Sequence, residues 1–397
     1  MKLDSATYRL TDSGNLRRLP LILTIVGAAS SLVMYFSDPG HFFHAYLTAF
    51  TFWMTIGLGA LFFTLIQHIV AAEWSIVVRR LAENAMILIP FMAILFIPIA
   101  LGIGQLYEWS HADVVAKDHL LSQKAGYLNV PFFLARAALY FVIWFFLTRS
   151  LYKSSLTQDS QPSESLIVRM RRVSAPGLVL FALSLTFMAF DWLMSLDPHW
   201  YSTIFGVYIF SGSVIGFMAF LTLVSMYLRS RGALDQCITV EHYHDYGKLL
   251  FAFVVFWAYI AFSQFFLIWY GNIPEETMFF HHRAEGSWLF VSAILLPIGH
   301  FALPFLLLIL RSTKRGLGSL RIMAIWMFVL HYIDLYWVSM PNYLHHGPSL
   351  LQALQALGPF LFVGGAFMWL FWGNVLASPV VPVNDRRLAA SLHFTNA

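Results

Sequence analysis

The sequence predicts an all-α integral membrane protein with about ten transmembrane helices, and three observations support this fold class. Of its 397 residues, 59% are hydrophobic and 11% are charged, which is unlike an ordinary soluble domain. Ten windows are mainly apolar over the roughly 20 residues that a helix needs to cross the hydrocarbon layer. These windows are continuously apolar rather than alternating in polarity, which argues against membrane strands.

The ten windows form one membrane domain at 19–378, between a short N-terminal segment at 1–18 and a tail at 379–397. In chain order they lie near 19–36, 41–70, 84–104, 130–152, 174–195, 200–228, 246–270, 286–310, 317–338 and 355–378. The first window has a basic flank but no convincing cleavage site, so we expect a retained helix rather than a signal peptide. No stretch outside the windows is long enough for a separate catalytic domain, so we expect the chain to depend on partner subunits.

The middle of the chain is predicted to be two quasi-repeats of four helices, helices two to five within 41–195 and helices six to nine within 200–338. Each repeat has an aspartate followed seven residues later by a proline, Asp191 to Pro198 in FDWLMSLDP and Asp334 to Pro341 in IDLYWVSMP. Because four is even, the repeats share one orientation and the two acids lie at matching depths. We therefore expect two four-helix bundles in parallel quasi-repeat, flanked by the first and last helices.

Lysine and arginine are concentrated on the side of the membrane that holds both termini. The opposite loops contain only Lys117, Lys124 and Arg283. By the positive-inside rule, both termini are expected in the cytoplasm, for a multi-pass protein of a bacterial inner membrane. The net charge of +4 thus reflects topology, and membrane lipid rather than nucleic acid is the expected surrounding. The polar stretch 154–164 is predicted to be a cytoplasmic linker between helices four and five.

Cys237 is the only cysteine, so the chain cannot form an internal disulfide or supply the usual four thiolates of an iron–sulfur cluster. It also lacks the C-x-x-C-H motif for covalent haem, so such centres are expected on other subunits. Intramembrane haem b would need two facing histidines at similar depth, whereas His68, His300 and His331 are expected at inner, central and outer depths. No recognised zinc spacing occurs, and we expect no metal site.

Polar side chains in the outer third of the membrane are the first candidate site, because ionisable groups at membrane depth usually mark pathways, substrate sites or compensated pairs. The group comprises Arg136, Tyr140, Asp191, Gln264, His331 and Asp334. Arg136 is expected to pair with Asp191, and both a structural ion pair and a functional site remain open. His331 and Asp334 are three residues apart and share a helix face, which makes them the stronger titratable site, although a satisfied structural histidine remains the alternative.

A second set of polar residues lies toward the side with the termini. The candidates for a proton path are His68, Glu73, Asp245 and His300. Most polar residues near these helix ends, Glu83 included, are expected to be ordinary wet or interfacial groups. His300 lies nearer the middle of helix eight, where it is either an interhelical hydrogen-bonding residue or a relay toward His331 and Asp334.

Four segments closely resemble the ActF family, integral subunits of bacterial alternative complex III within the broader NrfD/PsrC-like family. They are ALFFTLIQHIVAAEWSIVVRRLAEN at 60–84, FMAFDWLMSLDPHWYSTIFGVYIFSG at 187–212, AYIAFSQFFLIWYGNIPEET at 258–277 and HYIDLYWVSMP at 331–341. The resemblance implies a non-autonomous subunit of a respiratory or photosynthetic quinol:cytochrome c oxidoreductase. It further implies a paralogous ActC subunit, haem c and iron–sulfur clusters on outer partner subunits, and a terminal oxidase as a further possible partner.

The resemblance leaves several roles open for this chain. One is quinol binding near Asp191 or near His331 and Asp334, and the latter pair could supply a proton acceptor and a hydrogen-bond partner. A second is proton translocation coupled to chemistry elsewhere, and a third is a scaffold for the paralogous subunit. An independent secondary transporter is the fourth, since parallel repeats and buried acids also occur there, although the family-specific motifs weigh against it. The outer loops near 105–129, 271–285 and 339–354 are expected to dock the redox subunits.

Overall fold

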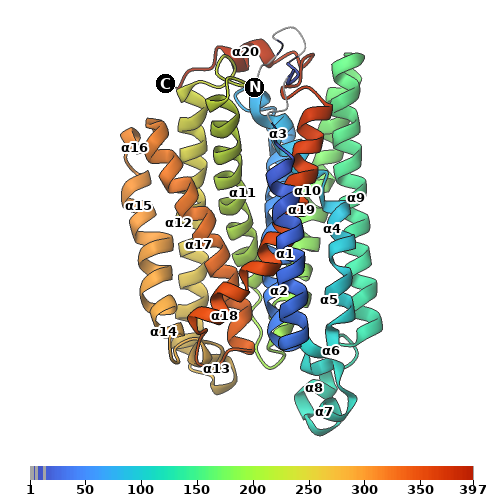
Figure 1. The fold of residues 1–397 in the computed structure, drawn as a ribbon, viewed down its shortest axis with the longest axis vertical. Coiled ribbons are helices and arrows are strands. Elements are labelled where there is room, and N and C mark those ends of the chain that lie inside the picture. The colour runs from blue at the N-terminus through green and yellow to red at the C-terminus, as the bar shows by residue number, and fades with distance from the viewer. Residues whose placement is uncertain (1–3, 5–7, 12–14, 397) are drawn as a thin grey trace.

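The computed structural model describes residues 4, 8–11 and 15–396, and within them the chain is a bundle of long helices (Figure 1). Ten helical stretches in this part are long and apolar enough to cross a membrane, so the predicted all-α integral membrane fold is confirmed. Seven of them contain one long helix each: α1 (Arg18–Ser37), α2 (Pro39–Ile69), α9 (Val130–Ser160), α10 (Glu164–Trp192), α11 (Phe205–Ser230), α12 (Val240–Gly271) and α17 (Leu317–Ser339).

The other three stretches are broken. The third consists of α3 (Ile76–Met86), α4 (Ile89–Leu95), α5 (Ile97–Leu101) and α6 (Ile103–Leu106), the eighth of α14 (Trp288–Phe290), the π-helix η3 (Val291–Ala302) and α15 (Leu303–Leu308), and the tenth of α18 (Leu350–Gln355) and α19 (Leu357–Ala377). Pro90, Pro98 and Pro297 lie in the third and eighth stretches, where each removes a backbone donor. Short connecting helices complete the chain: η1 (Glu108–Ser110), α7 (Ala112–Lys117), α8 (His119–Lys124), η2 (Met194–Leu196), α13 (Pro274–His282), α16 (Arg311–Arg315), η4 (Met340–Asn342) and α20 (Leu388–Leu392).

The helices form two bundles of four with two flanking helices. The first bundle contains α2, the broken third stretch, α9 and α10, and the second contains α11, α12, the eighth stretch and α17. Helices α2 and α11 pack against each other at the centre of the molecule and are buried along most of their length. Helices α1 and α19 pack against each other and against α2 (Figure 1). This arrangement agrees with the architecture expected from the quasi-repeat.

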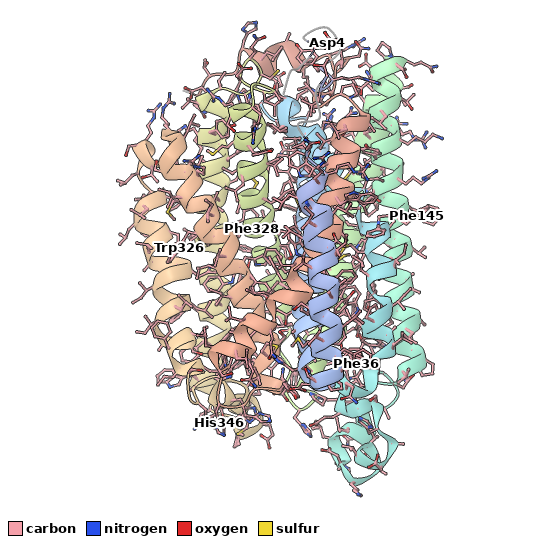
Figure 2. The ribbon with its side chains drawn as sticks, viewed as in Figure 1. Asp4, Phe36, Phe145, Trp326, Phe328 and His346 are labelled. Carbon is pink, nitrogen blue, oxygen red and sulfur yellow. The ribbon has the colours of Figure 1, made fainter. Side chains whose placement is uncertain are left out.

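The two ends of the bundle differ. Helix α1 begins and α19 ends at the same end, which residues 378–396 cover, and we call it the terminal face (Figure 1). The loops with α7, α8 and α13 lie at the other end, the opposite face. Asp4 marks the first and His346 the second in Figure 2, while Phe36 and Phe145 point outward from the side of the bundle. Both phenylalanines are exposed in the isolated chain, as expected of a surface that faces lipid.

Two boundary predictions and one burial prediction near the terminal face are wrong. The third stretch begins at Ile76 rather than near residue 84, so Arg79 and Arg80 lie inside a helix. The expected linker at 154–164 is mostly helical, because α9 continues to Ser160 and α10 begins at Glu164. Glu83, expected at a wet interface, is fully buried. The common reason is that these helices extend past their apolar runs, where their charged side chains are paired with one another.

Candidate functional site

Asp191 and Asp334 occupy corresponding places in the two bundles. Each lies in the last helix of its bundle, in α10 and in α17, a short distance before the helix ends at the opposite face. Both carboxylates are buried. Asp191 is paired with a cation, whereas Asp334 has only neutral hydrogen-bond donors. We therefore interpret Asp191 as part of a structural ion pair and Asp334 as part of a candidate site for proton chemistry.

Asp191 is a fully compensated acid. Arg136 donates to its carboxylate from Nε at 2.8 Å and from Nη2 at 2.9 Å, so the predicted ion pair is present. The hydroxyls of Tyr140 and Tyr127 donate to the same carboxylate at 2.6 Å and 2.9 Å. The guanidinium of Arg136 also lies 3.8 Å from the centre of the Tyr127 ring. With four donors on two oxygens, this cluster is typical of a buried ion pair that holds helices together.

Asp334 has no such cation. Its carboxylate accepts hydrogen bonds from the hydroxyl of Tyr208 on α11 and from the indole N–H of Trp257 on α12, the latter at 3.1 Å. Within the part of the chain that the structure describes, no lysine or arginine lies within ion-pair distance of it. A buried carboxylate held by two neutral donors is costly to keep ionised. Asp334 is therefore a more suitable proton acceptor than Asp191.

His331 lies one turn before Asp334 but has a different partner. Its Nε2 is 2.9 Å from the hydroxyl oxygen of Thr55 on α2, and its Nδ1 has no hydrogen-bond partner among the described residues. The ring fits against α11 because that helix has glycine at 212 and 216. A Cβ on Gly216 would lie 2.5 Å from Cδ2 of His331. The histidine thus joins the two bundles and keeps one ring nitrogen free.

His300 belongs to the same group, although the sequence placed it at a more central depth than His331. It lies in the π-helical η3, and its ring centre is 3.9 Å from that of Trp257. Both ring nitrogens are buried without a partner among residues 15–396 or the described N-terminal residues. π-Helical hydrogen bonding is rare and frequently occurs at functional sites, and here it extends over the 12 residues Val291–Ala302. Trp257 contacts His300 and also hydrogen-bonds to Asp334, so the structure places His300 in the same group as Asp334 and His331.

A cavity of about 1090 Å³ reaches this group from the side of the bundle. It lies between α12 and the eighth stretch, with α13 at its opposite-face end, and most of its walls are apolar or aromatic. The lining residues Tyr259 and Phe262 are also exposed on the lipid-facing surface, so the cavity opens toward the membrane. Its polar lining includes Tyr208, Trp257, Gln264, Ser292 and Trp337. The size is that of a small-molecule site.

The six outer candidates thus form two separate groups. Arg136, Tyr140 and Asp191 make the ion-pair cluster of the first bundle. His331 and Asp334 form the core of the second group, and Gln264 lines the cavity, where its side-chain oxygen accepts a hydrogen bond from Ser202 at 3.1 Å. Sequence reasoning missed Tyr208 and Trp257, which look like ordinary core aromatics in apolar helices. The glycine pair at 212 and 216, in a G-x-x-x-G spacing, was the available signal for a close contact here.

The candidates for a proton path are not gathered in one place. His68 is buried and its Nε2 has no described partner, whereas Glu73 is exposed at the surface. Asp245 pairs with Lys248 at 2.9 Å near the end of α12. His300, the fourth, lies in the Asp334 group described above. The structure therefore does not join these four residues into one chain of contacts.

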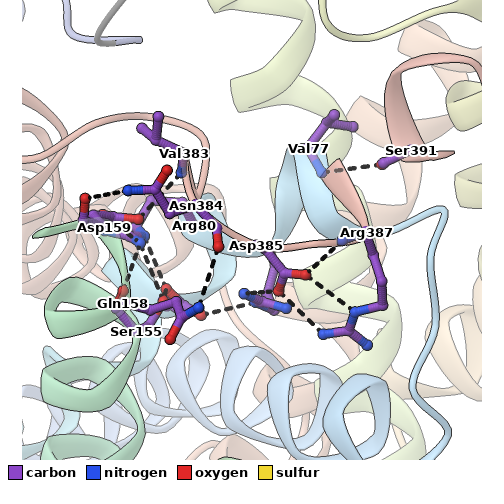
Figure 3. A network of polar contacts seen from close by, with 12 residues as sticks. Val77, Arg80, Ser155, Gln158, Asp159, Val383, Asn384, Asp385, Arg387 and Ser391 are labelled. Carbon is purple, nitrogen blue, oxygen red and sulfur yellow. Dashed lines mark hydrogen bonds and ion pairs between the residues drawn. The ribbon is translucent and has the colours of Figure 1, made fainter. Parts of the chain in front are cut away.

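The terminal face instead contains a buried charge network that the sequence did not predict (Figure 3). Arg79 contacts Glu83 and Asp385, each at 3.0 Å. Arg80 contacts Glu83 at 2.9 Å and Asp159 at 2.8 Å. Burial alone would raise the pKa of Asp385, but Arg79 and Arg387 together lower it below its ordinary value. The network fixes the tail to the first bundle.

The same tail also contacts the second bundle. The carbonyl of Ser391 lies 3.0 Å from Nε2 of His242, and the side-chain amide of Asn396 donates to the carbonyl of Glu241 at 3.0 Å. In the first bundle, the Val383 N–H donates to Asp159 at 3.1 Å (Figure 3). Residues 383–396 therefore connect the ends of both bundles across the terminal face.

Comparison with protein-family models finds no match, and comparison with curated proteins finds none. Among the described residues, no group of three or more His, Cys, Asp or Glu side chains is arranged to hold a metal ion.

Proposed function

We propose that this chain is an integral subunit of a quinol:cytochrome c oxidoreductase, that it binds quinol in the cavity beside α12, and that Asp334 accepts a proton from it. In this proposal the terminal face lies in the cytoplasm of a bacterial inner membrane, as the distribution of lysine and arginine indicates. The single observation that supports the proposal most is the position of Tyr208 and Trp257, which both line the cavity and hydrogen-bond to Asp334.

The cavity suits a quinol for reasons of shape and polarity. An amphiphilic aromatic molecule dissolved in the bilayer can enter from the lipid-facing side, and its ring would meet aromatic walls. Its hydroxyl groups need hydrogen-bond partners at depth, and Tyr208 and Gln264 offer them from different walls. The walls between these polar points are mainly apolar and suit the remainder of the molecule.

The two side chains on Asp334 have different chemical capacities. A tyrosine hydroxyl both donates and accepts, so Tyr208 can take a proton from a quinol hydroxyl while its own proton passes to Asp334. An indole N–H only donates, so Trp257 can orient Asp334 but cannot carry the proton. Complete oxidation of one quinol releases two protons and two electrons. One proton would pass through Tyr208 to Asp334, and the second would leave to water. The two electrons would go to haem c and iron–sulfur clusters on partner subunits, since this role assigns no redox metal to the chain itself.

The partner subunits in this proposal dock at the opposite face. The expected docking segments, near 105–129, 271–285 and 339–354, contain the short helices α7, α8 and α13. Helix α13 also borders the cavity, so a redox partner bound there would be close to the proposed quinol site. The paralogous ActC subunit is a further partner in this proposal, and a terminal oxidase receives the electrons from cytochrome c.

The test is quinol:cytochrome c reductase turnover, with proton release measured in parallel, in the native complex carrying Asp334→Asn or Tyr208→Phe. Both variants are expected to lower turnover by about 10² or more, the usual contribution of a positioned acid or base. Tyr336→Phe is the matched control, because the Tyr336 hydroxyl on the same helix α17 has no described hydrogen-bond partner. All complexes must first contain every subunit and haem in wild-type amounts.

The outcomes separate the roles that the sequence left open. Lost turnover in a fully assembled complex supports the quinol site. Normal turnover with altered proton movement refutes it and supports the second candidate, proton translocation, which the free ring nitrogens of His300 and His331 favour. Normal turnover with normal proton stoichiometry leaves the scaffold role. Loss of assembly in the variants alone also points to a scaffold.

A further inference from the structure

A second hollow, of about 640 Å³, lies on the outside of the first bundle near the terminal face. It is formed between α9 and α10, and we call it the α9–α10 groove. Its apolar wall contains Leu147 from α9 and Val173, Pro176, Gly177 and Leu180 from α10. Arg169 and Arg172 lie at its end toward the terminal face, together with Glu164 and Ser165. The groove is remote from the cavity of the proposed quinol site, because it belongs to the other bundle.

The two arginines at the groove are unpaired. Within the described part of the chain, neither Arg169 nor Arg172 has a hydrogen bond or an ion pair, and both are exposed. The acid at the rim, Glu164, is already held by Arg386 at 2.5 Å. The arginines are three residues apart on α10, so they share one face of the helix. The end of the groove therefore carries positive charge without a counterion from the chain.

The wall of the groove continues into the lipid-facing surface. Leu180, at the membrane-interior end, is exposed in the isolated chain, as are its neighbours Val179 and Leu183 on α10. Helices α9 and α10 approach closely at Gly177, where a Cβ would lie 2.9 Å from Cδ2 of Leu147. The apolar part of the groove thus runs along the helices from the two guanidinium groups toward the membrane interior.

We propose that the α9–α10 groove binds an anionic phospholipid, with its phosphate against Arg169 and Arg172 and one acyl chain along Leu147, Val173 and Leu180. A basic pocket between membrane helices at the interface is the arrangement that binds anionic headgroups. The guanidinium groups provide charge-assisted donors for the phosphate oxygens. The apolar wall has no function for a soluble phosphate, which is why a lipid is the expected occupant. This proposal is independent of the role in quinol oxidation.

The test uses the full chain in its native assembly, reconstituted into phosphatidylcholine nanodiscs that contain a minor share of phosphatidylglycerol. Retained lipid is identified and counted by mass spectrometry after mild detergent extraction. Wild type is expected to retain phosphatidylglycerol in preference to phosphatidylcholine. Arg169→Gln and Arg172→Gln are each expected to weaken this preference about fivefold, the effect of one basic residue near an anionic membrane surface.

Two matched controls make the result specific. Arg171→Gln removes the same charge from the same turn of α10, but Arg171 does not line the groove, so retention is expected to stay at the wild-type level. Leu180→Trp is expected to obstruct the acyl-chain wall and lower retention, whereas Val179→Trp places the same bulk outside the groove. The tryptophan pair keeps the proposal testable if an arginine variant fails to assemble.

Three results would overturn the proposal. Equal loss in Arg171→Gln would mean that the lipid responds only to overall positive charge. Equal retention of phosphatidylcholine and phosphatidylglycerol by wild type would mean that the groove does not select an anion. Glycerol 3-phosphate carries the phosphate but has no acyl chain. If it displaced the bound lipid when added at the same concentration as the lipid, the site would bind phosphate alone and the acyl chain would not contribute to binding.

Discussion

Trp257 donates its indole N–H to Asp334 at 3.1 Å and places the same ring 3.9 Å from the ring of His300. One aromatic side chain of α12 thus contacts an acid from α17 and a histidine from η3. It also forms part of the wall of the 1090 Å³ cavity. A substitution of Trp257 should therefore alter the surroundings of both Asp334 and His300, although the indole itself cannot transfer a proton.

Trp257→Phe should affect the proposed reaction less than Tyr208→Phe. Phenylalanine keeps an aromatic ring in the cavity wall and removes only the donor that orients Asp334, so we expect turnover to fall by about tenfold. Loss of the Tyr208 hydroxyl removes the proposed proton carrier and should cost about 10² or more. Steady-state kcat and KM for quinol, measured over a range of pH, distinguish the two. Equal losses in the two variants would contradict the assigned roles.

The ion pair of Arg136 and Asp191 should behave as a stabilising element. Arg136→Met leaves a buried carboxylate without its cation and is expected to lower the free energy of unfolding by about 3–5 kcal/mol. The double variant Arg136→Met/Asp191→Leu removes both charges and should recover most of that loss. Thermal unfolding in detergent measures both. If the double variant were less stable than the single one, the pair would not be a compensated structural pair.

The close packing of His331 on α11 predicts a steric effect at Gly216. A Cβ at this position would lie 2.5 Å from Cδ2 of His331 and 3.0 Å from Cδ1 of Ile56, so Gly216→Ala is expected to destabilise the fold by about 1–3 kcal/mol. Gly318→Ala on α17 is the control, because nothing lies within 4 Å of a Cβ there. The midpoint of thermal unfolding should fall for the first variant and stay level or rise for the second.

The contacts that hold residues 383–391 to the first bundle should persist at about pH 5. The pKa of Asp385 is lower in the folded chain than its ordinary value of about 3.9, so its contribution to stability is present above that value. The contribution is lost only as the pH falls further, through the lowered pKa of the folded state. Hydrogen exchange of residues 383–391, corrected for intrinsic rates, should be equally slow at about pH 7 and pH 5.

Asp385→Asn provides the comparison for the tail. The variant removes the negative charge between Arg79 and Arg387, so exchange in residues 383–391 should be faster at both pH values. Glu164→Gln is the control at an exposed ion pair with Arg386, where little change is expected. Fast exchange in wild type at about pH 5 would contradict the assignment of Asp385 as the anchor.

The long apolar runs made the ten helices predictable, because a bilayer leaves few alternatives for such segments. The two bundles were predictable from the quasi-repeat, in which Asp191 and Asp334 are each followed seven residues later by a proline. The pairing of Arg136 with Asp191 also followed from depth, since both lie near the same side in adjacent helices. The partners of Asp334 did not follow. Tyr208 and Trp257 lie on two different helices. They point toward Asp334 because of how each helix is rotated about its axis, and this rotation cannot be read from composition or hydropathy.

The terminal face shows the opposite limitation. In the sequence, Arg79, Arg80 and Glu83 look like ordinary interfacial charges, and hydropathy placed the start of the third helix near residue 84, after all three of them. They are buried only because Asp159 and Asp385 arrive from distant parts of the chain to pair with them. Charge pairing over such separations depends on the completed fold, so a local analysis of the sequence assigns these residues to the surface.

The connection that residues 383–396 make between the bundles has a consequence for biogenesis. These residues leave the ribosome only after the ten membrane helices have been synthesised. The third stretch, which contains Arg79, Arg80 and Glu83, is therefore inserted into the membrane before Asp385 is available to pair with Arg79. Closure of the terminal face is then a late event, in which the tail contacts Asp159 in one bundle and His242 in the other.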